Sequence, residues 1–230
     1  MNSPHRFSKA APLLVLCVMV FPAALHARVG ETQDMLEKRL LQPGVGKLYP
    51  RPTEPKDNKP KSPKDRDTER QARKEAQDDV LKDIRAFLPA DTHEMFYWKS
   101  AVANQLSNDT GWKVDVLYIG GRSALEVYKR VGDSLNSFEV KGILNANRGN
   151  SSWKKVTNEG GGTNGIGYSY ELEDGSLRAS QQDGWVMVFS VKLDNYVMQQ
   201  QLVAKAENDH QLDQQKREQA QKAPESVSGF

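Results

Sequence analysis

The chain has 230 residues, of which 37% are hydrophobic and 27% are charged, and its formal net charge is +2. This size and composition predict one modest domain with polar extensions rather than two packed domains. Nucleic-acid-binding proteins typically concentrate positive charge on one surface, and a net charge so close to zero gives no sign of such a surface. We therefore expect no nucleic-acid partner.

The first 27 residues have the pattern of a secretory signal peptide. Arg6 and Lys9 precede an apolar run over residues 13–21, and small residues lead up to Ala27. The run is shorter than the roughly 20 apolar residues that a membrane-spanning helix needs. We expect cleavage after Ala27, which removes two of the 32 basic residues and leaves a secreted or periplasmic protein without a transmembrane segment.

The only cysteine, Cys17, lies within this leader. Lipidation of Cys17 is an alternative to cleavage after Ala27. It is disfavoured because the bulky Leu16 precedes the cysteine and the apolar run continues past it. After cleavage the chain has no disulfide, no cysteine nucleophile and no thiolate metal ligand, so its stability must come from its core.

Two segments precede the main domain. Thr32 is a favoured N-cap for a short helix whose apolar face carries Leu36 and Leu40, so residues 28–49 are predicted to hold a short N-terminal helix. Residues 50–67 contain five prolines among mixed charges and no other apolar residue. Such a composition predicts an extended, disordered linker.

The main domain is predicted to span residues 68–205. It opens with a predicted helix that carries one apolar stripe and ends at Pro89. The first half of this helix should be exposed to solvent, and the second half should pack against the rest of the domain. Residues 95–98 are aromatic and favour a strand, although a capping box at Asp91 leaves a helix as the alternative.

The centre of the domain is predicted to be a hairpin followed by a helix. Apolar residues alternate over residues 112–118, and the glycine pair at 120–121 tolerates the positive φ angles of a tight turn. Asn136 and Glu139 have the spacing of a capping box. A short amphipathic helix should therefore lie across the apolar face of the hairpin.

Three alternating segments, at residues 167–173, 176–182 and 185–192, predict an antiparallel meander with Asp-Gly turns between its strands. Asp194 is then a candidate N-cap for a helix, and residues 206–230 form a polar tail that passes from helix to disorder. The fold class that follows is α+β. It is a small antiparallel sheet of about five to six strands, hairpin plus meander, with helices packed on one face.

Candidate catalytic residues are sparse, and we expect no enzyme activity, no metal site and no cofactor. Residues 160–165 match the dinucleotide fingerprint, but a strand follows them, so a phosphate would have no helix N-terminus to bind. Ser123 lacks the second glycine of a nucleophile elbow, and His93 has no histidine partner outside the polar tail. Glu171 and Glu173 define the alternative of a carboxylate-dependent hydrolase, although their alternation with apolar residues is typical of a solvated sheet face.

Aromatic side chains are the candidate binding surface. Aromatic residues that alternate with polar residues along strands are more often the core of a small sheet than a ligand groove. The residues assigned to this candidate surface are Trp98, Trp112, Tyr168, Tyr170 and Trp185.

Several motifs together point to a known group of proteins. They are Arg28-Val-Gly-Glu-Thr32, the hairpin, the helix at residues 138–147 and the Trp153-Lys-Lys that follows it. In these motifs the chain resembles a group of uncharacterised secreted bacterial proteins with an Arg-Ile/Val-Gly-Glu-Thr start, and more distantly it is similar to small lipoproteins of outer-membrane assembly. The resemblance implies an envelope or extracellular location and no known activity. The chain departs from the group at residues 50–67, which look like an insertion.

These patterns predict a secreted or periplasmic, non-enzymatic binding module whose partner is another protein of the cell envelope. An exposed sheet edge and two polar arms offer the contact surfaces. Besides the hydrolase, the alternative is a coiled-coil-like assembly through residues 68–88 and 194–222. It is weakened by apolar heptads that are not sustained.

Overall fold

The computed structural model describes residues 28–42, 46–48, 79–100, 110–156, 165–182 and 184–222. The predicted signal peptide, the predicted linker and the end of the polar tail lie outside these residues. So do residues 68–78 of the helical stripe and most of the glycine-rich segment.

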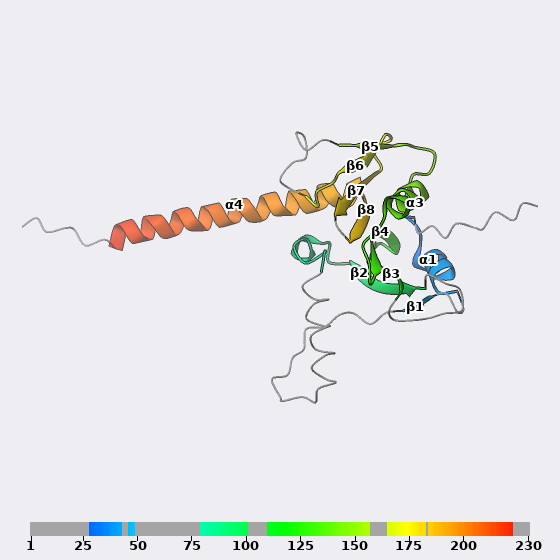
Figure 1. Ribbon diagram of the computed structural model, residues 1–230. Coiled ribbons are helices and arrows are strands. Elements are labelled where there is room, and N and C mark those ends of the chain that lie inside the picture. Colours follow the sequence, from blue (N-terminus) through cyan, green and yellow to red (C-terminus); the bar gives the residue numbers. More distant parts are fainter. Residues whose placement is uncertain are drawn as a thin grey trace, which may run out of the picture.

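The described residues form one antiparallel sheet of eight strands in the order β1-β2-β3-β4-β8-β7-β6-β5 (Figure 1). The predicted α+β class is confirmed, but five to six strands understated the sheet. The two outermost strands, β1 and β5, have only three residues each, too few to produce an alternating pattern. The strand bounds are β1 Gly46–Leu48, β2 His93–Lys99, β3 Gly111–Ile119, β4 Arg122–Val131, β5 Trp153–Lys155, β6 Tyr170–Leu172, β7 Leu177–Gln182 and β8 Trp185–Ser190.

The predicted central hairpin is confirmed as β3 and β4. Gly120 and Gly121 form its turn with φ angles of 58° and 74°, the left-handed region that a two-residue primed turn requires. The pairing shifts by one residue between Leu117 and Tyr118, where a bulge interrupts the ladder. The strand favoured over a helix at residues 95–98 is also confirmed, because it forms part of β2.

The helices are α1 (Gln33–Leu40), α3 (Ser137–Asn147) and α4 (Val191–Lys222), with a 3-10 turn η1 (Arg85–Phe87). Thr32 caps α1, since its hydroxyl accepts a hydrogen bond from the Met35 amide. Asn136 and Glu139 form the predicted capping box at the start of α3. Both predicted helix starts are therefore confirmed.

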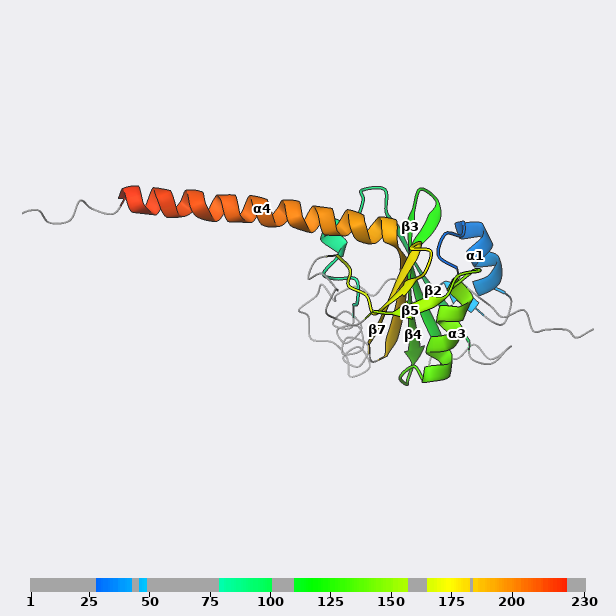
Figure 2. The same ribbon diagram turned by 90° about the horizontal axis from the view of Figure 1, so that it is seen from above.

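The sheet is covered on both faces rather than on one. On the first face, α1 and α3 pack over a cluster that includes Val114, Val116 and Tyr128 (Figure 2). On the second face, Leu81 and the first turns of α4 pack over a cluster that includes Leu117 and adjoining strand residues. The prediction of helices on one face was wrong because the central strands are apolar on both sides, as strands buried between two layers are.

Two predicted helices differ in detail. Residues 79–87 form successive turns and η1 instead of a continuous helix, yet Leu81 and Ile84 are buried as expected. Apolar residues three positions apart fall on one side of a tight-turn segment as well as of a helix, so the spacing does not distinguish them. Helix α4 begins before Asp194, because the hydroxyl of Ser190 accepts the Leu193 amide three residues later.

Helix α4 projects far beyond the domain in both views (Figures 1 and 2). With 32 residues it is about 48 Å long at a rise of 1.5 Å per residue. Val197 near its start is fully buried, whereas every residue from 202 to 219 is exposed. We call residues 202–219 the α4 arm. Among the described residues, no helix has the length and the apolar character needed to cross a membrane.

The segment before α1 is part of the domain. The backbone of Gly30 donates to the Ser123 carbonyl, and the Ser123 amide donates to the Glu31 carbonyl, each at 2.8 Å. The Ser123 hydroxyl accepts from the Gly30 amide and donates to the Arg28 carbonyl, at 3.0 and 3.1 Å. Asn147 of α3 accepts the Val29 amide at 3.0 Å. Residues 28–32 therefore link β4 to α3 through hydrogen bonds, and we call this segment the clasp.

Candidate functional site

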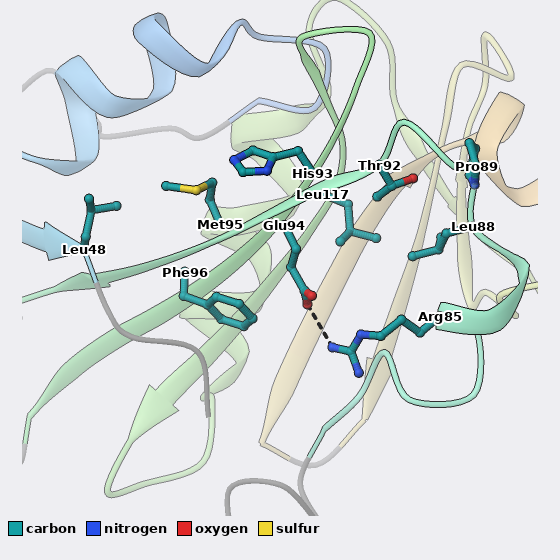
Figure 3. A pocket seen from close by; sticks show the side chains of 10 residues that line it. All are labelled: Leu48, Arg85, Leu88, Pro89, Thr92, His93, Glu94, Met95, Phe96 and Leu117. Carbon is teal, nitrogen blue, oxygen red and sulfur yellow. Dashed lines mark hydrogen bonds and ion pairs between the residues drawn. The ribbon is translucent and has the colours of Figure 1, made fainter. Parts of the chain in front are cut away.

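A hollow of about 590 Å³ lies beside β2 (Figure 3). Part of its lining comes from the segment between η1 and β2, where the Thr92 amide donates to the Pro89 carbonyl and closes a turn. Apolar side chains make up most of the wall. The lining residues are Leu48, Arg85, Leu88, Pro89, Thr92, His93, Glu94, Met95, Phe96 and Leu117.

Arg85 is the charged centre of the hollow. Its guanidinium donates to Glu94 Oε1 at 2.9 Å, the contact drawn in Figure 3, and it forms a second ion pair with Asp79. Burial opposes the charge on Arg85, but the two carboxylates outweigh it and raise its pKa further. Burial also raises the pKa of Asp79, yet the hydrogen bond from Arg85 and its charge hold that pKa below its ordinary value.

A further ion pair lies on the second face of the sheet and involves Asp115 of β3. Lys129 Nζ lies 3.5 Å from Asp115 Oδ2. Burial raises the pKa of Asp115 to about 6, the charge of Lys129 lowers it, and the nearby carboxylates of Glu94 and Asp79 raise it again. Asp115 does not line the hollow, so it has no direct access to a molecule bound there.

The polar groups in the lining of the hollow come from both sides of β2. His93 and Glu94 point to opposite sides of β2, because neighbouring side chains alternate along a strand (Figure 3). Two lining atoms, Thr92 Oγ1 and Arg85 Nε, are buried and lack a hydrogen-bond partner in the structure. Within the described ranges, no group of three or more His, Cys, Asp and Glu residues is placed to hold a metal ion.

The five candidate aromatic residues do not form one surface. Trp112 and Tyr170 pack against the cluster on the first face, whereas Tyr168 and Trp185 pack against the cluster on the second. Trp98 is buried, with only 1% of its surface exposed. Three of them lie beside a cation, since Lys47, Arg130 and Arg178 are 4.9, 5.1 and 4.1 Å from the rings of Trp98, Trp112 and Tyr168.

Glu171 and Glu173 each lie beside a cation of their own. Arg178 Nε donates to Glu171 Oε1 at 2.9 Å, and Lys154 Nζ lies 3.6 Å from Glu173 Oε1. Neither glutamate lines the hollow. This arrangement gives the hydrolase hypothesis no support.

The contacts that hold the base of α4 against the loop before β6 and against β7, called the junction below, were not predicted from the sequence. Asp194 is buried; its Oδ1 accepts the Ile166 amide at 2.7 Å and its Oδ2 accepts from Arg178. Gln201 accepts the Gly165 amide at 2.6 Å and donates to the Gly165 carbonyl at 3.3 Å. The sequence signal was the candidate N-cap Asp194, but the structure places Ser190 at the start of α4 and uses Asp194 in this junction instead.

Gly165, the last glycine of the fingerprint match, has a structural role at this junction. Its φ angle is +93°, and a Cβ atom on it would come within 2.6 Å of Asp194 Oδ1. Residues 166–169 have no helical structure and lead into β6. The rejection of a dinucleotide site is consistent with this, because no helix N-terminus follows Gly165.

A buried polar group that the sequence did not reveal lies under the clasp. Glu126 is fully buried and accepts a hydrogen bond from the Tyr128 hydroxyl, while its Oε1 atom has no partner. Burial raises the pKa of Glu126 to about 7, although the hydrogen bond from Tyr128 lowers it. Nearby, the Tyr97 hydroxyl donates to Glu37 of α1 at 3.0 Å. The alternation of side chains along the strand shows on which face Glu126 lies. It does not show that a helix covers that face.

Comparison of the chain with protein-family models, with curated proteins and with solved structures finds no match.

Proposed function

We propose that this protein is a non-enzymatic binding module of the cell envelope, secreted or periplasmic, which uses the α4 arm to bind another envelope protein. One observation carries the proposal: a long helix is held firmly at its base and exposed along the rest of its length. The signal-peptide pattern of residues 1–27 supports the location.

The base of α4 is fixed by both apolar and polar contacts. Leu193 and Val197 are buried in the cluster on the second face. Asp194 is paired with Arg178, and Gln201 brackets the backbone of Gly165. These contacts set the direction in which the arm leaves the domain, so a partner meets a preorganised helix, which lowers the entropy cost of binding.

The α4 arm offers a partner a polar helix with a few exposed apolar side chains. An isolated polar helix gains little stability in water, because most helical stability in proteins comes from packing one face against other elements. Leu202, Val203 and Leu212 are the large apolar side chains that the arm exposes. At about 100° per residue, Leu202 and Leu212 lie about 80° apart around the helix axis and can contact one partner surface, whereas Val203 and Leu212 lie on opposite sides.

Truncation tests this proposal directly. A variant that ends at Gln201 keeps the residues that form the base contacts and removes the whole arm. Crosslinking in the native envelope, followed by mass spectrometry, should recover one reproducible protein with the full chain and lose it with the truncated chain. Lys154→Gln, on the far edge of the sheet, is the matched control and should leave the recovery unchanged. Equal recovery by the full and truncated chains would contradict the proposal.

A further inference from the structure

Glu126 places a carboxyl group in the apolar layer between the sheet and the helices α1 and α3. Its register partners are Val116 on β3 and Val188 on β8, which share its face of the sheet and are fully buried. Both valines belong to the cluster on the first face, to which α1 contributes Leu36 and Leu40. Glu126 itself has no exposed surface, so its carboxyl group meets water only if this cover moves.

Only one oxygen of the Glu126 carboxyl group is hydrogen-bonded. The Tyr128 hydroxyl donates to Oε2, whereas Oε1 is buried and accepts no hydrogen bond from the residues that the structure describes. A neutral carboxyl group tolerates this arrangement, but a carboxylate would lose its hydration without compensation. Burial accordingly raises the pKa of Glu126 to about 7, and the hydrogen bond from Tyr128 offsets this only in part. The closed packing therefore favours the protonated form.

The groups on the neighbouring elements already have partners of their own. Arg39 is paired with Glu31, and Glu37 accepts a hydrogen bond from Tyr97 at 3.0 Å. The tyrosines stay neutral at moderate pH, because burial raises the pKa of each above its ordinary value. The titratable and charged side chains around Glu126 are Glu31 of the clasp, Glu37 and Arg39 of α1, Glu139 of α3, Tyr97 of β2, Tyr118 of β3 and Tyr128 of β4.

The clasp and α1 are the part of this cover that is most easily displaced. β4 is paired with β3 on one side and with β8 on the other, so moving the strand would break two ladders. α3 is held at its end by Trp153, whose Nε1 donates to the Leu144 carbonyl at 2.6 Å. α1 has only eight residues, too few to form a stable helix in water without packing. Water therefore reaches Glu126 most readily when the clasp and α1 lift together.

We propose that residues 28–40, the clasp and α1, form a lid over Glu126 that closes when this carboxyl group is protonated and opens when it ionises. Opening hydrates the carboxylate and exposes the apolar surface beneath α1. The lid packs on the first face, while α4 packs against the second, so this role is independent of the proposed role of the α4 arm.

Amide hydrogen exchange in the full chain measures the opening, because α1 loses its helical hydrogen bonds when it lifts. The rates are corrected for the intrinsic effect of pH on exchange. The fraction of open lid, measured at residues 33–40, should increase about tenfold or more between about pH 5 and pH 7, because the open form releases the Glu126 proton more readily. These amides should also exchange faster than those of the β3–β4 ladder, and with a weaker urea dependence, since opening exposes less surface than global unfolding.

Two variants identify the carboxyl group responsible. Glu126→Gln cannot ionise at this position and should abolish the increase with pH. Glu37→Gln changes a carboxylate of α1 itself and is the matched control, which should keep the increase.

Two results on the parent protein would overturn the proposal, whether or not the variants fold. One is an opening of α1 that does not increase with pH. The other is exchange of α1 at the same rate and with the same urea dependence as the β3–β4 ladder, because α1 would then open only in global unfolding. An increase with pH that persists in a folded Glu126→Gln variant would overturn it as well.

Discussion

Asp194 Oδ2 accepts a hydrogen bond from Arg178 Nη1 at 2.5 Å, and this ion pair joins the first turn of α4 to β7. The side chain of Asp194 is 6% exposed and that of Arg178 is 18% exposed, so the pair is largely shielded from water. Arg178 also reaches Glu171 and stacks over Tyr168. One arginine therefore ties together the strand, the loop before β6 and the base of the helix.

Breaking this pair should destabilise the domain. Asp194→Asn keeps the shape of the side chain but leaves Arg178 without its buried partner, so the free energy of unfolding should fall by about 1 to 3 kcal/mol. Urea unfolding followed by circular dichroism measures it. Lys154→Gln removes the exposed pair with Glu173 and should cost less than about 0.5 kcal/mol. Equal losses in the two variants would show that the junction does not hold α4.

Gly165→Ala should lower the free energy of unfolding more than an alanine substitution at another glycine with positive φ. A methyl group at Gly165 would lie 2.6 Å from Asp194 Oδ1, while one at Gly175 would meet no atom within 4 Å. Gly175→Ala should therefore lose only about 1 kcal/mol, the cost of a left-handed alanine, and Gly165→Ala clearly more. Thermal and urea unfolding of both variants test this, and a Gly165→Ala loss no larger than the Gly175→Ala loss would rule out the close approach.

Ser123→Ala should loosen the clasp at residues 28–32. The variant loses the hydroxyl that accepts from Gly30 and donates to Arg28, at a cost of about 1 to 2 kcal/mol. Hydrogen exchange should quicken over residues 28–40 more than in the meander. Ser176→Ala, which removes an exposed hydroxyl bonded to Asp174, is the control. Unchanged exchange in the N-terminal segment would argue against a clasp.

Glu126 should make stability depend on pH in a defined direction. Its folded-state pKa of about 7 lies above the ordinary value of 4.5, so the folded protein binds the proton more tightly than the unfolded chain. The stabilisation is therefore fully present below about pH 4.5 and is lost as the pH rises to about 7, by up to about 3 kcal/mol.

The Glu126→Gln variant cannot ionise at this position, so its free energy of unfolding should lack this part of the decline. Its stability relative to the parent protein should therefore increase as the pH rises. Asp115, whose pKa is also raised, contributes in the same direction at lower pH and is tested separately with Asp115→Asn. Urea unfolding of each protein between pH 4.5 and 8 supplies the comparison. Parallel curves for the parent and Glu126→Gln would refute this assignment.

Features set by neighbouring residues could be predicted from the sequence. Gly120 and Gly121 determine their turn locally, and Asn136 with Glu139 forms a capping box within four residues. β1 could not be predicted, because three residues show no periodicity and the strand is defined by its partner β2, far along the chain.

The candidate sites depend on contacts that have no local signal. The hollow brings together Leu48, Arg85 and Leu117 from three separate segments. The apolar residues on both sides of the central strands were a sequence signal for a sheet covered on both faces, but the division of the candidate aromatic residues between two clusters depends on contacts between distant segments.

The central claim is that the α4 arm binds a protein partner, and site-specific photocrosslinking in the native envelope tests it most directly. A photoreactive residue is placed in turn at Leu202, Leu212 and positions around them on the arm, and at Lys141 on the domain as a control. We predict capture of one protein in a pattern that repeats about every 3.6 residues along the arm, with none at Lys141. Capture at Lys141 but at no position of the arm would contradict the account.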